Sequence, residues 1–512
     1  MWEIPDYSIV PRKVNYNTMV NPQKVQVAAR KVPIFYDTER VFYHLFANEA
    51  YAFWLDSSRV DSKLSRFSFM GTNDGPMTKT IYYDMKNKQI QCLDANGKTE
   101  INESIFEYLD HELLKMNQQS PELPFDFNGG FVGYLGYELK ADCGTQPFHN
   151  SSQPDAIFIF ADRIIAFDHE ERCIYLVSIV PIDKKELAND WFGTVENKLK
   201  NISELPPLVI EDIESVPSLN IKLSQKYSKY IDTIKECQKY IFNGETYEIC
   251  LTNKICVQEQ FDPFLTYRIL RSINPAPYSA FFKFPEFSIL CSSPERFLKI
   301  DKNRIVEAKP IKGTIARGTD IEEDIRLAEY LRTNEKERAE NLMIVDLLRN
   351  DLGLVCDVGS VHVPNLMSVE SYETVHQLVT TIRGSLRNDL TCIDCIKAAF
   401  PGGSMTGAPK LRTMKFIDEL ETEARGVYSG AIGFMGINGT IDLNIVIRTI
   451  IMSPEEATIG AGGAITILSD PNQEFEEMAL KGEALVKALI ISRYGKCDQI
   501  QLEHILRENP AS

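Results

Sequence analysis

Short apolar runs separated by turn residues dominate the first two hundred positions of the chain. Runs rich in β-branched and aromatic residues are typical of strands, and they occur at 50–56, 66–71, 80–85, 89–94, 129–139 and 156–168. Residues 101–116 place apolar side chains at helical spacing instead. The pattern predicts a mostly β region over residues 31–200, preceded by a loosely held polar arm at residues 1–30.

The periodicity breaks at residues 201–222, a stretch with three prolines and several acids that is typical of a surface linker. Residues 224–245 then predict an amphipathic helix that ends at the turn Asn243-Gly244. Helices and strands intermix from there on, so we expect a larger catalytic region at 223–497 and a tail at 498–512. The predicted fold class is α+β.

Composition narrows the functional classes. Apolar residues make up 44% of the 512 positions and charged residues 25%, as in a folded globular protein. The net charge of −17, without a dense Lys/Arg run, argues against a nucleic-acid partner but leaves room for an acidic small molecule. No apolar stretch reaches the roughly 18 residues of a membrane span, and no leader is apparent. We therefore expect no membrane partner and a cytoplasmic location.

Eleven scattered cysteines predict reduced thiols rather than a disulfide framework. The one tight pair is Cys392 and Cys395. Two thiols on a helix is the simpler interpretation of this pair, and redox or zinc chemistry is the alternative.

Two acidic pairs have the spacing of one helix face. Glu337 and Glu340 are three residues apart, as are Glu474 and Glu477, and Lys481 follows one turn after Glu477. Either pair alone is more typical of a solvated helix surface. If the two helices faced each other, their carboxylates would offer hard oxygen ligands to a Mg²⁺ ion.

Two glycine-rich segments could approach a ligand. Residues 400–410 resemble a phosphate loop, but Ala408-Pro409 stands where such a loop requires Lys-Ser/Thr. This difference excludes a P-loop nucleoside triphosphatase. Pro409 suits a first helical turn, so backbone N–H groups of residues 404–406 could point at an anion. Residues 460–465 could bring backbone to a ligand or serve tight strand packing.

A lysine and an acid complete the candidate chemistry. Lys312 shares a segment with Lys309 and Arg317, whose like charges could lower its pKa and favour a neutral nucleophile. Glu295 could protonate a leaving hydroxyl. Taken alone, both side chains are more typical of a protein surface.

Five ordered motifs resemble one family. PIKGT (310–314), KERAENLMIVDLLRND (336–351), FPGGSMTGAPK (400–410), RGVYSGAIGF (425–434) and SDPNQEFEE (469–477) are similar to the chorismate-binding enzymes, which include anthranilate, isochorismate, salicylate and aminodeoxychorismate synthases. The similarity is dense over 225–495 and thinner over 31–200. It implies an anthranilate-synthase-like fold, a β-sheet sandwich core with surrounding helices.

Few positions separate the branches of this family. Anthranilate synthases carry alanine where this chain has Lys312, and the lysine implies amination of chorismate at C4 to 4-amino-4-deoxychorismate, the precursor of para-aminobenzoate in folate biosynthesis. Isochorismate and salicylate synthases have a lysine base near the position of Glu248, which argues against them. Anthranilate synthesis and a non-catalytic chorismate-binding relative remain the alternatives.

The resemblance also implies residue roles. Lys312 would attack C2 of chorismate while Glu295 protonates the departing hydroxyl. Mg²⁺ would bind Glu340 and Glu477, with Glu337 and Glu474 in an outer shell. The residues expected to contact the substrate are Thr314, Ser404, Tyr428, Arg448, Gly462, Gly463, Ala464 and Lys481.

Three further expectations follow from the resemblance. No glutaminase nucleophile motif is present, so ammonia would come from a glutamine amidotransferase subunit in a heterodimer. A family histidine is replaced by Gln377, and whether His376 substitutes for it is open. A pocket for an aromatic amino acid is expected, although Leu-Asp-Ser departs from the usual Leu-Glu-Ser and leaves tryptophan binding open; its residues would be Leu55, Asp56, Ser57, Pro277, Tyr278 and Ser279.

Overall fold

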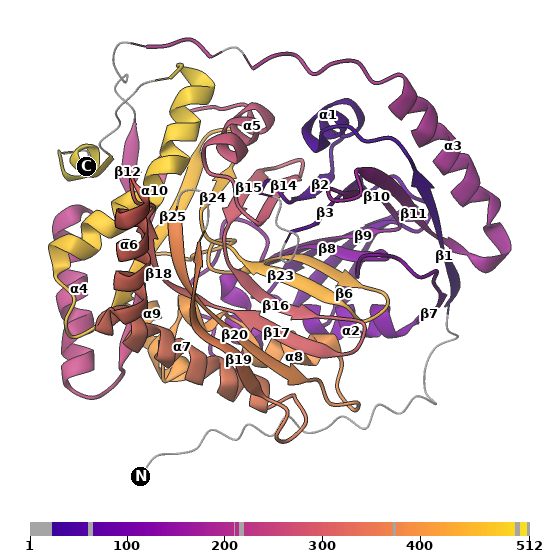
Figure 1. Ribbon diagram of the computed structural model, residues 1–512. Coiled ribbons are helices and arrows are strands. Elements are labelled where there is room, and N and C mark those ends of the chain that lie inside the picture. The colour runs from indigo at the N-terminus through magenta and orange to yellow at the C-terminus, as the bar shows by residue number, and fades with distance from the viewer. Residues whose placement is uncertain are drawn as a thin grey trace.

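The structure is a computed structural model that describes residues 23–59, 65–208, 210–213, 220–371, 375–496 and 502–508. The predicted arm up to residue 22, and parts of the predicted linker and tail, lie outside these ranges. Two large sheets form the centre of the molecule, and helices lie around them (Figure 1). The α+β class and the sandwich of sheets expected from the sequence are confirmed.

The first sheet has 13 strands, of which β21 (Gly407–Ala408) pairs with β13 beside the main path. Its order along that path is β12 (Ile221–Leu223), β13 (Glu248–Val257), β25 (Ala457–Ile465), β24 (Thr449–Met452), β15 (Ser288–Ser293), β14 (Tyr278–Lys283), β2 (Ala52–Asp56), β3 (Phe67–Thr72), β10 (Arg163–Asp168), β11 (Cys173–Pro181), β1 (Gln23–Val32) and β7 (Met116–Gln119). Its pairings are antiparallel except for β1 with β7.

The second sheet has 12 strands, of which β19 (His362–Ser371) pairs with β20 beside the main path. Its order along that path is β18 (Ile311–Ala316), β20 (Val375–Ser385), β17 (Ile305–Lys309), β16 (Arg296–Ile300), β23 (Ile441–Ile445), β22 (Ala431–Gly436), β8 (Gly130–Leu135), β9 (Ala156–Ala161), β4 (Lys79–Asp84), β5 (Gln89–Asp94) and β6 (Gly97–Asn102). Central strands β8 and β9 are buried throughout, whereas edge strand β6 is polar and exposed, as an edge requires.

Helices cover the outer faces of both sheets. Their bounds are α1 (Thr38–Leu45), α2 (Ile105–Leu114), α3 (Glu186–Lys200), α4 (Tyr227–Phe242), α5 (Pro263–Ile273), α6 (Ile321–Thr333), α7 (Glu335–Gly353), α8 (Cys392–Ala399), α9 (Lys410–Leu420), α10 (Pro471–Arg493) and α11 (Leu502–Glu508). Short 3₁₀ turns are η2 (Tyr137–Cys143), η3 (Ile182–Lys184) and η4 (Gly403–Met405). No helix in the described part of the chain has the length and apolar character that crossing a membrane requires.

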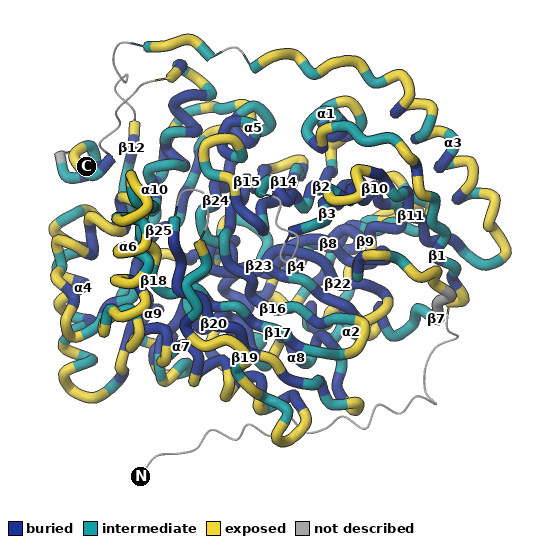
Figure 2. Tube along the Cα trace, in the orientation of Figure 1, coloured by how far each residue is buried: buried dark blue, intermediate teal, exposed yellow. Residues whose placement is uncertain are grey.

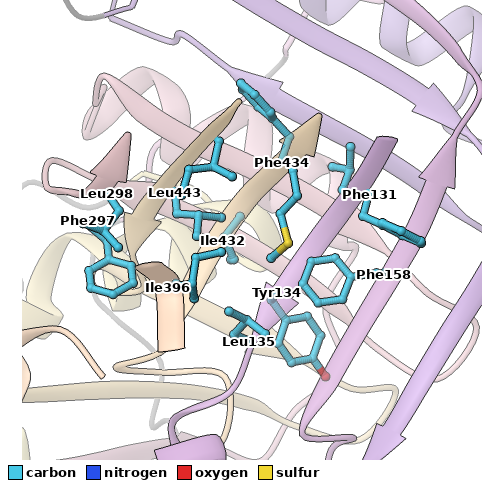
Figure 3. Close-up of a cluster of buried hydrophobic side chains, with 14 of the residues drawn as sticks. Phe131, Tyr134, Leu135, Phe158, Phe297, Leu298, Ile396, Ile432, Phe434 and Leu443 are labelled. Carbon is cyan, nitrogen blue, oxygen red and sulfur yellow. The ribbon is translucent and has the colours of Figure 1, made fainter. Parts of the chain in front are cut away.

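The main core lies between the sheets. Phe69 of β3 meets Phe434 of β22 with ring centroids 6.0 Å apart, and the Tyr82 hydroxyl of β4 donates to that of Tyr51. Figure 3 shows that the same hydrophobic cluster continues through β8, β9, β22 and β23 to Ile396 of α8 on the outer side of the second sheet. Figure 2 shows the same central strands as buried, with exposed surface along the outward sides of α3 and α4.

Several predicted boundaries differ from the structure. Residues 23–30, expected in the polar arm, belong to β1, because pairing with β11 outweighs their polar composition. The helix expected at 101–116 is shorter, since β6 and β7 take its ends. Residues 137–139 leave the expected strand for η2. The helix predicted at 224–245 is α4, which ends before Gly244 at φ +74°.

The predicted N-terminal and catalytic regions share both sheets. Strand β2 pairs with β14, and β8 pairs with β22, so hydrogen-bonded ladders join residues from either side of the expected linker. A division at 201–222 therefore does not separate two cores in the described part of the chain.

Candidate functional site

Lys312 and Glu248 form a buried ion pair at one end of the site. Lys312 lies on β18 and Glu248 is the first residue of β13, and the lysine Nζ donates to the glutamate Oε1 over 3.1 Å. Burial lowers the pKa of Lys312, but the carboxylates of Glu248 and Glu340 outweigh it, so the lysine pKa is raised above its ordinary value. The resting lysine is therefore a charged ammonium group.

The expected lowering of the Lys312 pKa by neighbouring cations is wrong. Lys309 pairs with Glu370 at 3.0 Å, and Arg317 pairs with Asp324 at 2.7 Å. Both cations are thus neutralised by their own partners. The carboxylates that face Lys312 come from β13 and α7, and their proximity depends on the fold rather than on the local segment.

Glu295 lies beside this pair, in the turn between β15 and β16. The Ser404 hydroxyl and the backbone N–H of Ile311 lie beside its buried carboxylate. Burial raises the pKa of Glu295 to about 7, although Ser404 and the positive charge of Lys312 oppose the shift. A carboxyl group that is partly protonated at neutral pH is suited to act as a general acid.

The glycine-rich segment 400–410 does not present the anion site expected from its sequence. The N–H groups of Met405 and Thr406 donate to the carbonyls of Gly402 and Gly403 within the η4 turn. Helix α9 begins only at Lys410, after a short pairing of β21 with β13. The segment instead positions the Ser404 hydroxyl against Glu295.

The two acidic pairs lie near each other, as the sequence predicted. Lys336 lies between the helices, its Nζ 3.9 Å from Glu340 and 3.7 Å from Glu474. The Glu340 Oε1 is buried and makes no hydrogen bond within the described residues. Burial raises the pKa of Glu340 to about 7, with Lys312 opposing it. The carboxylate oxygens of this group suit a hard divalent cation.

The four glutamates are nevertheless not drawn together at metal-ligand distances. Among the described residues, the acidic or thiol group whose ligand atoms lie within 4.8 Å of one another is Asp168, Glu171 and Cys173. Asp168 of that group already forms an ion pair with Arg66, so its charge is neutralised within the protein. Glu477 likewise has a partner, because Lys481 lies 2.6 Å away. That lysine holds the pKa of Glu477 below its usual value, despite the effect of burial.

Cationic and backbone groups for an anionic ligand lie next to the acids. The Lys481 Nζ donates to the Gly462 carbonyl over 2.8 Å, and an Arg448 Nη donates to the Lys481 carbonyl over 2.9 Å. Burial lowers the pKa of Arg448, against the influence of Tyr428 and Glu477. In the described residues this guanidinium makes no ion pair with a carboxylate. It is therefore available to bind an anion.

The remaining residues predicted to contact the substrate differ in their exposure and in whether they face the acidic group. Gly463 faces the acids, since a Cβ there would lie 3.0 Å from Glu474 Oε2, and Ala464 pairs with Cys250 on β13. Thr314 is exposed on β18, two residues beyond Lys312.

His376 does not occupy the place of the missing family histidine. Its ring nitrogens lie 2.9 Å from Asp324 Oδ1 and 2.8 Å from the Ser371 hydroxyl, so it ties α6 to β20. Because neighbouring strand residues point to opposite faces, Gln377 takes the other side, where it pairs with Thr314.

The residues expected to form an amino-acid pocket lie around a cavity of about 270 Å³ between the sheets. All six predicted residues line it. However, the Asp56 carboxylate pairs with Arg271 of α5 at 2.9 Å and accepts from the Tyr267 hydroxyl, on the outer face of the sheet. Asp56, which stands where the family usually has glutamate, therefore forms a structural ion pair and does not present its charge to the cavity.

Three residues in and around the candidate site were not predicted from the sequence as part of it. Glu248 is the partner of Lys312, Lys336 lies within the acidic group, and buried Arg425 donates to the carbonyls of Met405 and Cys250. Lys336 and Arg425 lie within the family motifs, but only the fold shows what they contact. The Cys392 and Cys395 thiols are free and buried on α8, where burial raises their pKa values.

Comparison with known proteins shows the family to which the chain belongs. A family model described as chorismate binding enzyme matches residues 68–487. An aminodeoxychorismate synthase of Streptomyces pristinaespiralis is 46% identical over 464 residues, which cover 90% of this chain and 64% of that protein. An anthranilate synthase component 1 of Acetivibrio thermocellus is 35% identical, over 88% of this chain and 93% of that protein.

A solved structure shows the same architecture. Anthranilate synthase component I from Streptococcus pneumoniae superposes with a TM-score of 0.71 at 32% identity, covering 83% of this chain and 93% of that chain. The chain belongs to the chorismate-binding enzymes. It spans about half to two thirds of the length of the most similar curated relatives, 50% to 66%.

Proposed function

We propose that the chain catalyses the amination of chorismate by ammonia, which gives 4-amino-4-deoxychorismate with the enolpyruvyl group retained. The observation that carries this proposal is the Lys312–Glu248 ion pair beside Glu295. Replacing a hydroxyl by an amine through a covalent intermediate requires a nucleophile, an acceptor for its proton and an acid for the leaving group. The similarity to aminodeoxychorismate synthases supports the same reaction.

In the first step Glu248 takes a proton from Lys312, whose Nζ then bonds to C2 of chorismate. Both ring double bonds shift by one position, the C4–O bond breaks, and the proton of Glu295 leaves with the hydroxyl as water. The 3.1 Å contact between Lys312 and Glu248 supports this transfer. The pKa of Glu295, about 7, supplies the protonated acid.

In the second step ammonia bonds to C4, both double bonds shift back, and the C2–N bond breaks. Lys312 leaves as an amine and regains the proton that Glu248 held. Glu295, now a carboxylate, accepts the excess proton of the new amine, so both acids return to their starting states. The side chain that was the acid in the first step is thus the base in the second.

Arg448 and Lys481 would hold the carboxylates of the substrate, with Tyr428, Thr314 and the backbone of 462–464 around them. Mg²⁺ at Glu340 and Glu477, with Glu337 and Glu474 around them, would neutralise the ring carboxylate of chorismate when bound. The buried Oε1 of Glu340, which accepts no hydrogen bond within the described residues, supports this role.

We further propose that a glutamine amidotransferase subunit supplies ammonia in a heterodimer and that the complex is cytoplasmic, where free thiols stay reduced. The similarity to a Bacillus subtilis protein named as component 1 of an aminodeoxychorismate synthase supports a partner subunit. Glutamine-dependent turnover after addition of a cognate glutaminase tests this. Its absence, while ammonium salts still support turnover, would count against the heterodimer.

The cavity lined by Leu55 and Tyr278 is our candidate for an aromatic amino-acid pocket. Titration calorimetry with tryptophan tests binding. Ala280→Trp, at the register partner of Leu55 in the β2–β14 ladder, would fill the cavity and abolish the heat of binding. Equal heats from this variant and the unchanged protein would contradict the assignment.

Mass spectrometry of the products formed from chorismate, Mg²⁺ and an ammonium salt tests the main proposal. We expect an aminated product that retains the pyruvate carbons. Lys312→Ala should lose most of this activity, and Lys309→Ala, which removes a lysine already paired with Glu370, is the matched control. Anthranilate with free pyruvate would instead assign the chain to the anthranilate branch, and full activity of Lys312→Ala would remove that lysine from the mechanism.

A further inference from the structure

Arg425, the first residue of the RGVYSGAIGF segment, joins two parts of the backbone that carry residues of the candidate site. Its side chain is only 3% exposed. The guanidinium donates to the Met405 carbonyl over 2.7 Å and to the Cys250 carbonyl over 2.8 Å. Met405 follows Ser404 in η4, and Cys250 lies two residues after Glu248 on β13. One side chain therefore ties the backbone beside Ser404 to the backbone beside Glu248.

Every N–H group of this guanidinium has an acceptor within the protein. Nε and Nη2 donate to the carboxylate oxygens of Glu421 at 2.8 and 2.7 Å, and Nη1 also donates to the Ser429 hydroxyl at 3.3 Å. Together with the carbonyls of Met405 and Cys250, these acceptors match the N–H groups of an arginine side chain one for one. The guanidinium of Arg425 is therefore committed to the protein and is not a ligand for the substrate.

The 3₁₀ turn η2 holds Arg425 from the other sheet. The Glu138 carboxylate accepts from the backbone N–H groups of Arg425 and Gly426, each over 2.9 Å. The guanidinium carbon lies 4.3 Å from the centre of the Tyr137 ring, within the range of a cation–π contact. Because η2 follows β8 of the second sheet and Cys250 lies in the first, Arg425 is fixed between the two sheets.

Glu421 and the loop backbone strengthen the same connection. Glu421 Oε1 accepts from the N–H and the hydroxyl of Thr252 on β13, each at 2.9 Å. The Cys250 N–H donates to the Thr406 carbonyl over 2.8 Å, directly after η4. The strand and the loop are thus held together just after the residues that supply the proton acceptor and the hydroxyl beside Glu295.

The proposed amination requires this kind of fixed spacing, because Glu248 takes a proton from Lys312 while Glu295 releases its own. A displacement of about 1 Å between such groups can cost about 10²-fold in rate. We propose that Arg425 is a positioning residue, which fixes the proton acceptor Glu248 relative to Ser404 and the acid Glu295 without contacting the substrate. This inference rests on the proposed amination.

Arg425→Lys tests the positioning role. Lysine keeps the positive charge but lacks the planar fork that reaches both backbone carbonyls. We expect kcat with ammonium to fall by about 10²-fold. The KM for chorismate should change little, because Arg448 and Lys481 are not among the groups that Arg425 holds.

The pH profile separates positioning from folding. The groups that lower the pKa of Glu295 include the Ser404 hydroxyl and the charge of Lys312. If η4 no longer holds that hydroxyl in place, the decline of kcat/KM should move to higher pH in Arg425→Lys. A variant that only folds less well has fewer active molecules but keeps the pH profile of the unsubstituted protein.

Arg271→Lys is the matched control. Arg271 also pairs with two carboxylates, those of Glu39 and Asp56, each at 2.9 Å, and its guanidinium carbon lies 4.9 Å from the centre of the Trp54 ring. These contacts lie on the outer face of the first sheet. Arg271→Lys should lower thermal stability, measured by thermal unfolding, and leave kcat and the pH profile unchanged.

Glu138→Gln tests the same connection from η2 and decides the matter if Arg425→Lys does not fold. One backbone N–H of residues 425–426 would then face an amide N–H₂, which cannot accept its hydrogen bond. We expect a smaller fall in kcat and a shift of the pH profile in the same direction. An unchanged kcat in the folded variants, or a lower kcat with an unmoved pH profile, would overturn the positioning role. Failure of the unsubstituted protein to aminate chorismate would instead overturn the proposed function.

Discussion

The charge of Lys312 is determined by residues far from it in sequence. Glu248 precedes it by 64 positions, yet their side chains meet at 3.1 Å, with the glutamate almost fully buried. A buried ammonium group without such a partner would lose its proton. The pair therefore keeps the resting lysine charged and provides the acceptor that a nucleophilic amine needs.

Removing that acceptor should separate catalysis from binding. In Glu248→Gln the amide cannot take the lysine proton, so we expect kcat to fall by about 10²–10⁴, while the KM for chorismate changes little. Steady-state kinetics with ammonium measure both constants. Glu245→Gln, which changes an exposed glutamate paired with Arg412, is the matched control. A kcat close to that of the unsubstituted protein would exclude Glu248 as the acceptor.

The elevated pKa of Glu295 predicts a pH dependence. The acid form is present below pH 7 and is lost as the pH rises through the folded-state pKa, about 7, so kcat/KM should decline over that interval. Ser404→Ala removes a hydroxyl that lowers this pKa, and the decline should move to higher pH. A decline at the same pH in Ser404→Ala would mean that another group titrates.

At the scale of single residues, the sequence predicted part of the site, but neither the partner of Lys312 nor the direction of its pKa shift. Lys312, Glu295 and Ser404 come together as the family motifs indicated. The sign of the lysine shift was mispredicted because the nearest cations in sequence, Lys309 and Arg317, are neutralised by Glu370 and Asp324. Cross-strand partners of this kind follow from strand register, which one sequence does not reveal.

At the scale of elements, helices α7 and α10 bring the acidic pairs together, with one lysine between them. Lys336 lies within 4 Å of carboxylates on both helices and is about half exposed. A divalent ion bound there would compete with this ammonium group for the same oxygens.

Lys336→Gln should therefore strengthen binding of Mg²⁺. The gain should be up to about fivefold, because an exposed ion pair contributes at most about 1 kcal/mol. Calorimetric titration with Mg²⁺ measures it. Arg338→Gln, with the same change of charge on the same helix, is the control, since Arg338 hydrogen-bonds to the Arg332 carbonyl instead. Weaker binding in Lys336→Gln would show that the lysine supports the ion site.

Local patterns predicted most of these elements. Apolar runs at 80–85 and 89–94 gave β4 and β5, and the helical spacing after residue 223 gave α4. The sequence pattern did not predict strand β1, because its polar residues form a strand only through long-range backbone pairing with β11. The break at 201–222 was correctly seen as irregular, but irregular chain does not imply a boundary between two cores.

At the scale of the whole molecule, the shared sheets predict how fragments behave. Residues 1–208 alone would leave β2 without β14 and β8 without β22, exposing long strand edges. We expect this fragment and a fragment of residues 220–512 each to lack cooperative thermal unfolding. Co-expression of both should restore it, as measured by circular dichroism. A cooperative transition in the first fragment alone would contradict a common core.

The ladder between β8 and β22 also bears on synthesis of the chain in the cell. Phe131 and Met435 are register partners, yet about three hundred residues are translated between them. At a translation rate of about 5–20 residues per second, β8 remains without its partner strand β22 for about 15–60 s. During that time an apolar strand edge faces the crowded surroundings of the ribosome. We therefore expect the nascent chain to engage chaperones before its C-terminal strands emerge.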